Sequence, residues 1–400
     1  MIPAHSLSET VKQIANEGGF DLAGIAPVRA FAELAYFPEW IDGGHAGEME
    51  YLKRRDDAGT LKRASLESVA PWARSVIVCA MNYNTAEPYS TQVNDAERGW
   101  ISRYAWSRED YHDAVLRRLR AVESRLAGYA EKWRQDAATT AGETPALQKH
   151  SSSDGNEING ASALQTRCYV DTGPLVERVY AKYAGVGWIG KNTCILNQKM
   201  GSWLFLGVIL TSLELTPDLP AADRCGTCTR CLEACPTDAF IGPYQLDSNK
   251  CISYLTIEKR GSITEDLREG IGLNVFGCDI CQDVCPWNRK APATALPEFQ
   301  PRAGLVNPAL DWLAELQADE FREVFRGSPI RRTKINGLRR NALIAMGNSG
   351  YRDFLPALQR LGSDPDPVIA ESAQWASRKL KEAETDGNAL PSSPQRIGIE

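Results

Sequence analysis

The sequence lacks several signals that would define other classes of protein. It has only four histidines in 400 residues, and none pairs with another at the spacing of metal ligands. No run of eighteen apolar residues occurs, so we expect no membrane span. The chain does not open with a basic stretch followed by an apolar one, nor with a twin-arginine pair, which indicates a cytoplasmic protein. There is also no GxGxxG motif after a strand and no Walker loop.

The charge and the cysteine content are more informative. A net charge of −6 argues against broad nucleic-acid binding, which depends on neutralising phosphates. Eleven cysteines are present, and eight of them fall between residues 225 and 285, whereas Cys79, Cys168 and Cys194 are scattered. Disulfides are disfavoured in a reducing cytosol. Clustered thiols in such a chain therefore predict metal ligation.

The spacing of these cysteines is that of two 4Fe-4S clusters. In the first motif, two residues lie between Cys225 and Cys228 and again between Cys228 and Cys231, and the motif ends in Cys235-Pro236. The second motif ends in Cys285-Pro286. In bacterial ferredoxins the last cysteine of such a run binds the other cluster. The second motif has Val275 where a further cysteine would fall, so we assign the nearby Cys251 instead. The expected ligands are Cys225, Cys228, Cys231 and Cys285 for one cluster, and Cys235, Cys251, Cys278 and Cys281 for the other.

Zinc is the alternative for this segment, because paired CxxC motifs also bind zinc. Eight thiols, two Cys-Pro endings and no nearby histidine favour clusters. Such clusters relay electrons one at a time, so we expect the region before residue 225 to hold the reactive cofactor.

Hydrophobic patterning predicts a mixed, α+β fold. Apolar runs at 75–83 and 203–213 are typical of buried strands, and 109–135 has helical periodicity. We therefore expect an α/β domain in front, then a ferredoxin-like module, then a HEAT-like helical domain. The expected boundaries are 1–215, containing a flexible insertion at 136–165, then 216–295, 296–383 and a disordered tail at 384–400.

The stretch YVDTGPLVER places Asp171 before a Gly-Pro turn, where a carboxylate can perform acid–base chemistry. A turn or N-cap aspartate is the alternative reading. Glu177 and Arg178 are expected to be a solvated or paired helix start. The glycine-rich run that follows, AGVGWIGKNT, lets backbone approach a flat ligand or simply forms a loop.

Several long motifs resemble one family. YVDTGPLVER, GVGWIGKNTCILN, CGTCTRCLEACPTDAF, KCISYLTIEKRG, GCDICQDVCPWNR, ISRYAWSREDYHD and GEMEYLKRR are similar to segments of epoxyqueuosine reductases. The resemblance covers residues 5 to about 380. The insertion at 136–165 is longer than the family pattern requires.

The resemblance implies a cobalamin-dependent enzyme with two 4Fe-4S clusters. It would reduce epoxyqueuosine to queuosine in tRNA, the last step in making that nucleoside, using cob(I)alamin that the clusters supply with electrons. Asp171 would deliver a proton to the departing epoxide oxygen. The implied cobalamin contacts are Arg63, Ser102, Asp171, Asn192, Thr193, Ile195, Leu196 and Leu206.

The resemblance also gives meaning to the basic C-terminal segment. No acidic residue occurs between Val324 and Tyr351. This segment is either a solvated basic face or a surface for tRNA phosphates. Elsewhere in the chain, Trp106 and Tyr254 are candidate partners for stacked bases, and core packing is the alternative for both. The expected tRNA contacts are Arg331, Arg332, Lys334, Arg339 and Arg340. We further expect a monomer served by an external low-potential donor of the ferredoxin or flavodoxin type.

Three other functions stay open from the sequence. A reductive dehalogenase would share cobalamin and two clusters, but would normally carry an export signal. A plain ferredoxin-type electron-transfer protein would leave the first 200 residues without a role. An RNA-binding module with structural clusters is the third. Cobalamin binding and dependence on tRNA separate these alternatives.

Overall fold

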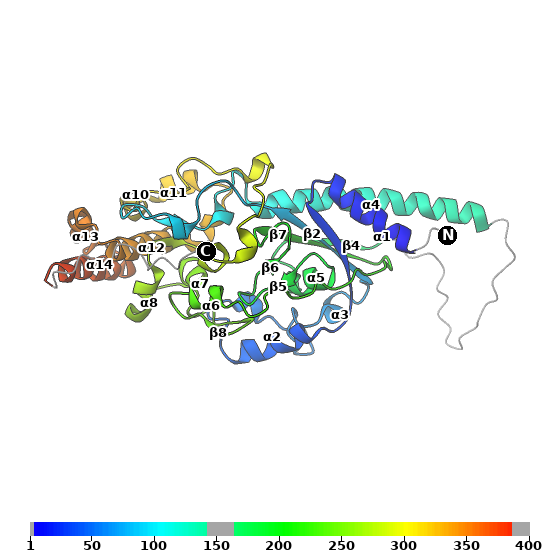
Figure 1. Ribbon diagram of the computed structural model, residues 1–400, viewed down its shortest axis with the longest axis horizontal. Helices are drawn as coiled ribbons and strands as arrows, with labels where there is room; N and C mark the ends of the chain where they lie inside the picture. The colour runs from blue at the N-terminus through cyan, green and yellow to red at the C-terminus, as the bar shows by residue number, and fades with distance from the viewer. Residues whose placement is uncertain (1–3, 142–163, 386–400) are drawn as a thin grey trace.

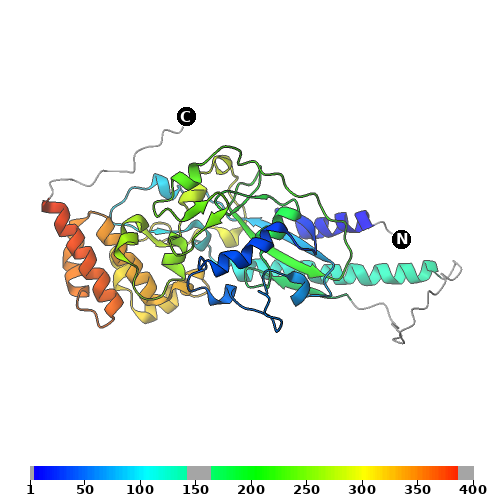
Figure 2. The same cartoon turned by 90° about the horizontal axis from the view of Figure 1, so that it is seen from below.

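The computed structural model describes residues 4–141 and 164–385. The molecule is elongated, with three C-terminal helices at one end, a helix-covered sheet towards the other, and the cysteine-rich segment between them (Figures 1 and 2). None of the described helices is both long and apolar enough to cross a membrane.

A four-stranded sheet forms the core of the N-terminal half. Its order is β1 (Leu22–Pro27), β2 (Ser75–Asn82), β7 (Leu204–Thr211) and β4 (Thr166–Tyr169). All three pairings are antiparallel, with Ile25 opposite Ile77, Cys79 opposite Gly207 and Cys168 opposite Ile209. The predicted strands at 75–83 and 203–213 are confirmed, but the α/β expectation is wrong, because it requires a mainly parallel sheet.

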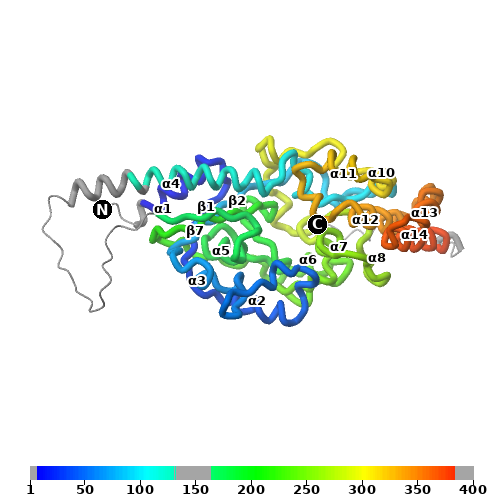
Figure 3. The backbone as a smooth tube through the Cα atoms, turned by 180° about the vertical axis from the view of Figure 1, so that it is seen from behind, coloured from blue at the N-terminus to red at the C-terminus, as the bar shows by residue number. Residues whose placement is uncertain are grey.

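Both faces of this sheet are covered, which explains why the central strands β2 and β7 are largely apolar along their whole length. Helices α1 (Ala4–Glu17) and α4 (Tyr111–Ala141) lie on one face, while α2 (Ala32–Asp42), α3 (Leu66–Val69) and α5 (Glu177–Tyr183) lie on the other (Figure 3). Every residue of β2 is buried. A Cβ atom at Gly207 would lie 2.8 Å from Leu119 of α4, so glycine permits the close helix–sheet contact.

The second core joins segments that are far apart in the sequence. Strand β3 (Trp100–Ile101) pairs in parallel with β10 (Asn274–Phe276), and both belong to one apolar cluster that extends into the C-terminal helices. The helices that contribute are α7 (Ile252–Ile257), α8 (Glu265–Ile271), α10 (Leu310–Glu315), α11 (Ala318–Val324), α12 (Lys334–Asn348), α13 (Leu355–Leu361) and α14 (Pro367–Thr385). The expected boundary at 295–296 therefore does not separate two cores.

Short elements carry the cysteines and connect the two halves. Two are hairpins, formed by β5 (Trp188–Ile189) with β6 (Ile195–Leu196) and by β8 (Phe240–Gly242) with β9 (Gln245–Leu246). Two are short helices, α6 (Arg230–Glu233) and α9 (Ile280–Asp283). The 3-10 helices of the described residues are η1 (Glu50–Leu52), η2 (Ser90–Gln92), η3 (Arg103–Ala105), η4 (Pro286–Asn288), η5 (Pro297–Phe299), η6 (Pro329–Thr333) and η7 (Arg352–Phe354). Helices α6 and α9 pack against each other, so the two cysteine motifs meet.

The expected start of the insertion at residue 136 differs from the observed end of helix α4. Helix α4 continues to Ala141, so residues 136–141 are helical and do not belong to a flexible insertion. The rest of that insertion, apart from its last two residues, lies outside the described residues, as does the tail from 386. The helices expected in the C-terminal domain are confirmed as α12, α13 and α14, and Asp366 in the turn Asp-Pro-Asp-Pro accepts a hydrogen bond from the backbone of Val368 at the start of α14.

Candidate functional site

Asp171 lies in the loop between β4 and α5, where it adopts a left-handed backbone conformation with φ 55°. Its carboxylate is about half exposed, at 48%. The phenol of Tyr111, from the start of α4, donates a hydrogen bond to Asp171 Oδ2. A left-handed non-glycine residue is uncommon and often marks a functional position. The structure therefore brings the predicted acid together with a tyrosine 60 positions away.

Arg63 holds this loop through its backbone. Its guanidinium donates to the carbonyl oxygens of Asp171 at 2.7 Å and Leu175 at 3.2 Å. Two donors of one planar group fix the direction of the loop more firmly than a single bond would. Arg63 was expected to contact cobalamin, whereas its observed partners are the backbone of the acid loop.

Tyr111 is buried at 5% exposure between aromatic neighbours. Its ring stacks on Phe205 at 4.4 Å and meets Tyr104 edge-on at 5.8 Å. Burial, and then the negative charge of Asp171, raise the pKa of Tyr111 well above its ordinary value. Tyr111 therefore keeps its proton and remains the donor in its bond to Asp171.

Glu177 is buried, contrary to the solvated helix start that the sequence suggested. Burial, and then the charge of Asp171, raise the pKa of Glu177 to about 7. Its Oε1 has no hydrogen-bond partner among the described residues. A buried carboxyl with an unused oxygen beside the acid loop is a group that a polar ligand can satisfy.

The β5–β6 hairpin connects the acid loop to the cysteine-rich segment. Arg178 of α5 donates to the carbonyl oxygen of Thr193 at 2.7 Å. Asn192 donates to the carbonyl oxygen of Cys281 at 3.3 Å, and Lys191 donates to the carbonyl oxygen of Cys228 at 3.0 Å. The hairpin thus contacts both cysteine motifs and, through α5, the base of the Asp171 loop.

The remaining predicted cobalamin contacts differ in their exposure. Ile195 and Leu196 are buried, and Leu196 packs beside Cys285. Leu206 is half-buried on the face of the sheet that α5 covers. Ser102 is buried and donates to Asp279, which also accepts from the Trp100 indole at 3.0 Å. Ser102 therefore contacts the cysteine-rich segment through its hydrogen bond to Asp279.

All eight clustered thiols are free of disulfides, and their effects on one another's pKa indicate which of them lie near each other. Burial, and then the charges of Cys225 and Cys228, raise the pKa of Cys231 to about 11. Burial, and then nearby thiols including Cys231 and Cys225, raise the pKa of Cys285 to about 12. Cys285 of the second motif therefore lies near thiols of the first motif, and Cys194 acts on both Cys231 and Cys285.

Thiols of both motifs also act on one another around Cys278. Burial, and then the charges of Cys251, Asp279 and Cys235, raise the pKa of Cys278 well above its ordinary value. Cys281 interacts with Cys278 and Cys251 in the same way. The division of the eight thiols into two sets of cluster ligands remains a prediction.

Cys194 is a ninth thiol that sequence reasoning left unassigned. It lies on the β5–β6 hairpin and shares a hydrogen bond with Cys281, which is the main cause that lowers the pKa of Cys194. The sequence offers no signal for this contact, because the two residues are 87 positions apart in the sequence. Cys194 therefore lies near thiols of both cysteine motifs.

The predicted tRNA contacts do not form one basic face. Arg331 and Lys334 are exposed, but Arg339 is held by Asp364 at 2.7 Å. Arg340 is 1% exposed and donates to the carbonyl oxygens of Leu255, Lys259 and Gly261. The expectation that Arg340 contacts phosphate is therefore wrong, because its charge organises buried backbone.

The predicted stacking partners are also wrong, since Trp106 is fully buried and Tyr254 is 6% exposed. The exposed aromatic beside the site is Tyr51 of η1, at 43% exposure. Burial of part of its ring raises the pKa of Tyr51, and the charges of Arg63, Arg332 and Asp171 also act on it. Tyr51 lies in the GEMEYLKRR motif, whose role the sequence did not reveal.

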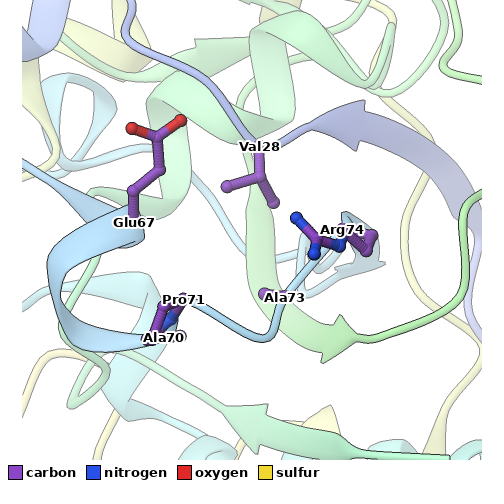
Figure 4. A pocket seen from close by; sticks show the side chains of 6 residues that line it. All are labelled: Val28, Glu67, Ala70, Pro71, Ala73 and Arg74. Atoms are coloured by element: carbon purple, nitrogen blue, oxygen red, sulfur yellow. The ribbon is translucent and has the colours of Figure 1, made fainter. Parts of the chain in front are cut away.

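A hollow of about 290 Å³ lies elsewhere, beside α3 and the end of β1. Figure 4 shows Glu67 and Arg74 at its wall with Val28, Ala70, Pro71 and Ala73. None of the predicted site residues lines it, so we do not associate it with the site around Asp171.

Comparisons with known proteins identify the class and then the family. A model described as a 4Fe-4S double cluster binding domain matches residues 224–288. This decides for clusters over zinc, and with the adjoining acid loop it defines an iron–sulfur oxidoreductase. A second model, described as "Epoxyqueuosine reductase QueG, DUF1730", matches residues 63–172. The chain belongs to the epoxyqueuosine reductase family.

Curated relatives and solved structures support this membership over nearly the whole chain. The epoxyqueuosine reductase of Pseudomonas aeruginosa is 36% identical, over 93% of this chain and 94% of that protein. That of a Synechocystis species is 40% identical, over 80% of this chain and 98% of that protein. A crystal structure of epoxyqueuosine reductase with a tRNA-Tyr epoxyqueuosine-modified stem loop is 28% identical, with TM-score 0.77, covering 97% and 96% of the two chains.

A further solved relative concerns the acid loop. A Bacillus subtilis epoxyqueuosine reductase, 28% identical with TM-score 0.76 over 97% and 96% of the two chains, is described with its catalytic aspartate loop swung out of the active site. Membership in this family favours the reductase over a plain ferredoxin-type protein, an RNA-binding module with structural clusters, or a dehalogenase.

Proposed function

We propose that this protein reduces epoxyqueuosine to queuosine in tRNA. The reaction consumes two electrons and two protons, opens the epoxide and releases its oxygen as water. The observation that carries the proposal is the position of Asp171, in hydrogen-bond contact with Tyr111 and connected by one short hairpin to a double-cluster segment. A proton donor and an electron supply thus meet in one place.

The two clusters supply the electrons. We assign one to Cys225, Cys228, Cys231 and Cys285, and the other to Cys235, Cys251, Cys278 and Cys281. The packing of α6 against α9 brings the two cysteine motifs together, which supports this assignment. Two 4Fe-4S clusters held by these thiols would relay electrons one at a time to a cofactor bound near the β5–β6 hairpin.

The residues around Asp171 fit cobalamin. The corrin ring carries many amide side chains, which need donors and acceptors from the protein. The unused Oε1 of Glu177 offers an acceptor, and the buried indole Nε1 of Trp188 offers a donor without a partner among the described residues. The backbone of residues 192–196 and the side chain of Leu206 complete the proposed contact surface. When bound, cobalamin supplies a strongly reducing, nucleophilic cobalt.

Asp171 delivers a proton to the departing epoxide oxygen. Its loop is held from below by Arg63 and its carboxylate is half exposed, so a substrate can reach the acid from solvent. Tyr111 fixes the direction of the carboxyl group through its hydrogen bond. Arg63 and Tyr111 therefore hold the loop while the carboxyl group of Asp171 stays accessible to a substrate.

The tRNA is held by residues around the mouth of the site. Arg331 and Lys334 are exposed and suit phosphate contacts, and Tyr51 suits stacking on an unpaired base. Helices α12 to α14 form the helical surface behind them, which we regard as a HEAT-like unit. We further propose a cytoplasmic monomer that receives electrons from an external low-potential ferredoxin or flavodoxin.

Nucleoside mass spectrometry tests the reaction. Epoxyqueuosine-containing tRNA is incubated anaerobically with cluster-reconstituted protein, cobalamin and a strong reductant, and a parallel sample omits cobalamin. We expect queuosine only in the complete sample. Absence of queuosine from a sample in which both clusters and cobalamin are shown to be bound would overturn the proposed function.

A further inference from the structure

Arg332 reaches the acid site from the C-terminal part of the chain. Its guanidinium Nη2 lies 3.3 Å from the phenol oxygen of Tyr111 and 4.0 Å from Asp171 Oδ2, and the group sits 5.9 Å from the centre of the Tyr111 ring. The phenol oxygen therefore accepts from Arg332 while its own hydrogen is donated to Asp171. The three groups form a chain of hydrogen bonds that runs from η6 to the loop after β4.

The backbone around Arg332 is anchored on both sides. Arg260 donates to the carbonyl oxygen of Arg332 at 2.9 Å, and Thr333 donates to the carbonyl oxygen of Thr256 at 2.9 Å. Ser328 caps the start of η6 by accepting from the amide of Ile330 at 3.3 Å. A long side chain on a fixed backbone can adopt fewer conformations, so the guanidinium stays directed at Tyr111.

Arg332 differs from its basic neighbours in the partners of its side chain. Arg331 and Lys334 are exposed, whereas the Arg332 side chain is 39% exposed and engages Tyr111 and Asp171. A phosphate that bound Arg332 would compete with both partners. Among these three residues, Arg331 and Lys334 thus face solvent and Arg332 faces the acid.

We propose that Arg332 is a positioning residue, which orients Asp171 through Tyr111 and makes the acid site depend on the C-terminal helical region. This inference rests on the proposed function and deepens it. A fixed positive charge beside a phenol strengthens the hydrogen bond that the phenol donates, because it draws electron density from the oxygen. The Asp171 loop is then held where an incoming substrate needs the proton.

The test separates positioning from phosphate binding. Single-turnover conversion at saturating tRNA and the Kd for the stem loop are measured for Arg332→Gln, Arg331→Gln and Arg322→Gln. Arg322 is an exposed arginine on α11, paired with Asp319, and serves as the matched control. We expect Arg332→Gln to lower the rate about 10- to 100-fold and to change the Kd less than about threefold. Arg331→Gln should chiefly weaken binding.

Chemical rescue provides a readout that a merely structural role would not change. Free guanidinium at millimolar concentration should restore part of the rate of Arg332→Ala, with no change in the Kd for the stem loop. A saturated rate equal to that of the unchanged protein, together with a Kd weakened as in Arg331→Gln, would overturn the inference. Lack of conversion by the unchanged protein would instead count against the proposed function itself, so the two failures are distinguishable.

Discussion

The side-chain amide of Asn192 donates a hydrogen bond to the backbone carbonyl of Cys281, at 3.3 Å. One bond thereby joins the hairpin beside Asp171 to a proposed cluster ligand. Arg178 attaches the same hairpin to α5, which begins where the acid loop ends. The electron supply and the proton donor are thus positioned by one short segment, and the predictions below probe its surroundings.

Cys251 and Cys194 are the two candidates for the fourth ligand of the second cluster, and the amount of bound cluster distinguishes them. Cys251→Ala should lose one of the two clusters, and with it about half of the bound iron, because a four-iron cluster needs four ligands. Cys194→Ala should keep both. Iron content and electron paramagnetic resonance after anaerobic reconstitution report the difference. Loss of a cluster in Cys194→Ala, with full loading of Cys251→Ala, would show that the assignment is wrong.

Tyr51 should carry part of the affinity for tRNA. Stacking of a base on an aromatic side chain is worth about 1–3 kcal/mol, so Tyr51→Ala should raise the Kd for the anticodon stem loop about 5- to 100-fold. Tyr51→Phe should stay within about twofold, since the ring remains. Tyr129, exposed on α4, provides the control substitution to alanine. Equal Kd values for the alanine variants of Tyr51 and Tyr129 would exclude stacking.

Glu177 should make the stability depend on pH. Its pKa rises from 4.5 in the unfolded chain to about 7 in the fold, so the folded state holds the extra proton between these values. Stability should therefore fall as pH rises from about 5 to 7, by up to about 3 kcal/mol.

Urea unfolding midpoints between pH 5.5 and 8 measure this effect. Glu177→Gln should show a flatter profile, whereas Glu67→Gln, an exposed control on α3, should match the unchanged protein. Identical slopes for Glu177→Gln and the unchanged protein would contradict the buried, proton-holding carboxyl.

Arg340 should matter for stability and not for tRNA binding. Replacing it by alanine removes the donor to the buried carbonyl oxygen of Leu255 and to the half-buried carbonyl oxygens of Lys259 and Gly261, which should cost about 1–3 kcal/mol. Arg331→Ala, at an exposed position, should change stability by less than about 0.5 kcal/mol. Thermal unfolding of the cluster-loaded proteins compares the two. A stable Arg340→Ala variant with weakened affinity for tRNA would show instead that Arg340 contacts phosphate.

Local patterns were sufficient for the parts of the structure that depend on local chemistry. The cysteine spacing led to the double-cluster segment that the family model confirms at residues 224–288, and apolar runs located β2 and β7. The strand direction was misjudged for a physical reason. Burial on both faces makes a strand apolar throughout whether its neighbours run parallel or antiparallel, so composition does not report direction.

Contacts between distant segments could not be predicted in this way. Nothing in the sequence near Tyr111 or Arg332 indicates that both approach Asp171, since their meeting depends on how α4 and η6 pack. The basic run after Val324 likewise contains arginines of opposite roles. Arg340 lies on the buried side of α12 and Arg331 lies on an exposed turn, although both have the same charge.

The most direct test of the central claim is the single-turnover conversion of epoxyqueuosine to queuosine by Asp171→Asn. Protein, cluster and cobalamin content are matched to the unchanged protein, and tRNA is saturating. The account predicts a loss of at least about 100-fold in rate, because the amide cannot deliver the proton, with clusters that are still reduced normally. Conversion at the rate of the unchanged protein would contradict the assignment of Asp171 as the acid.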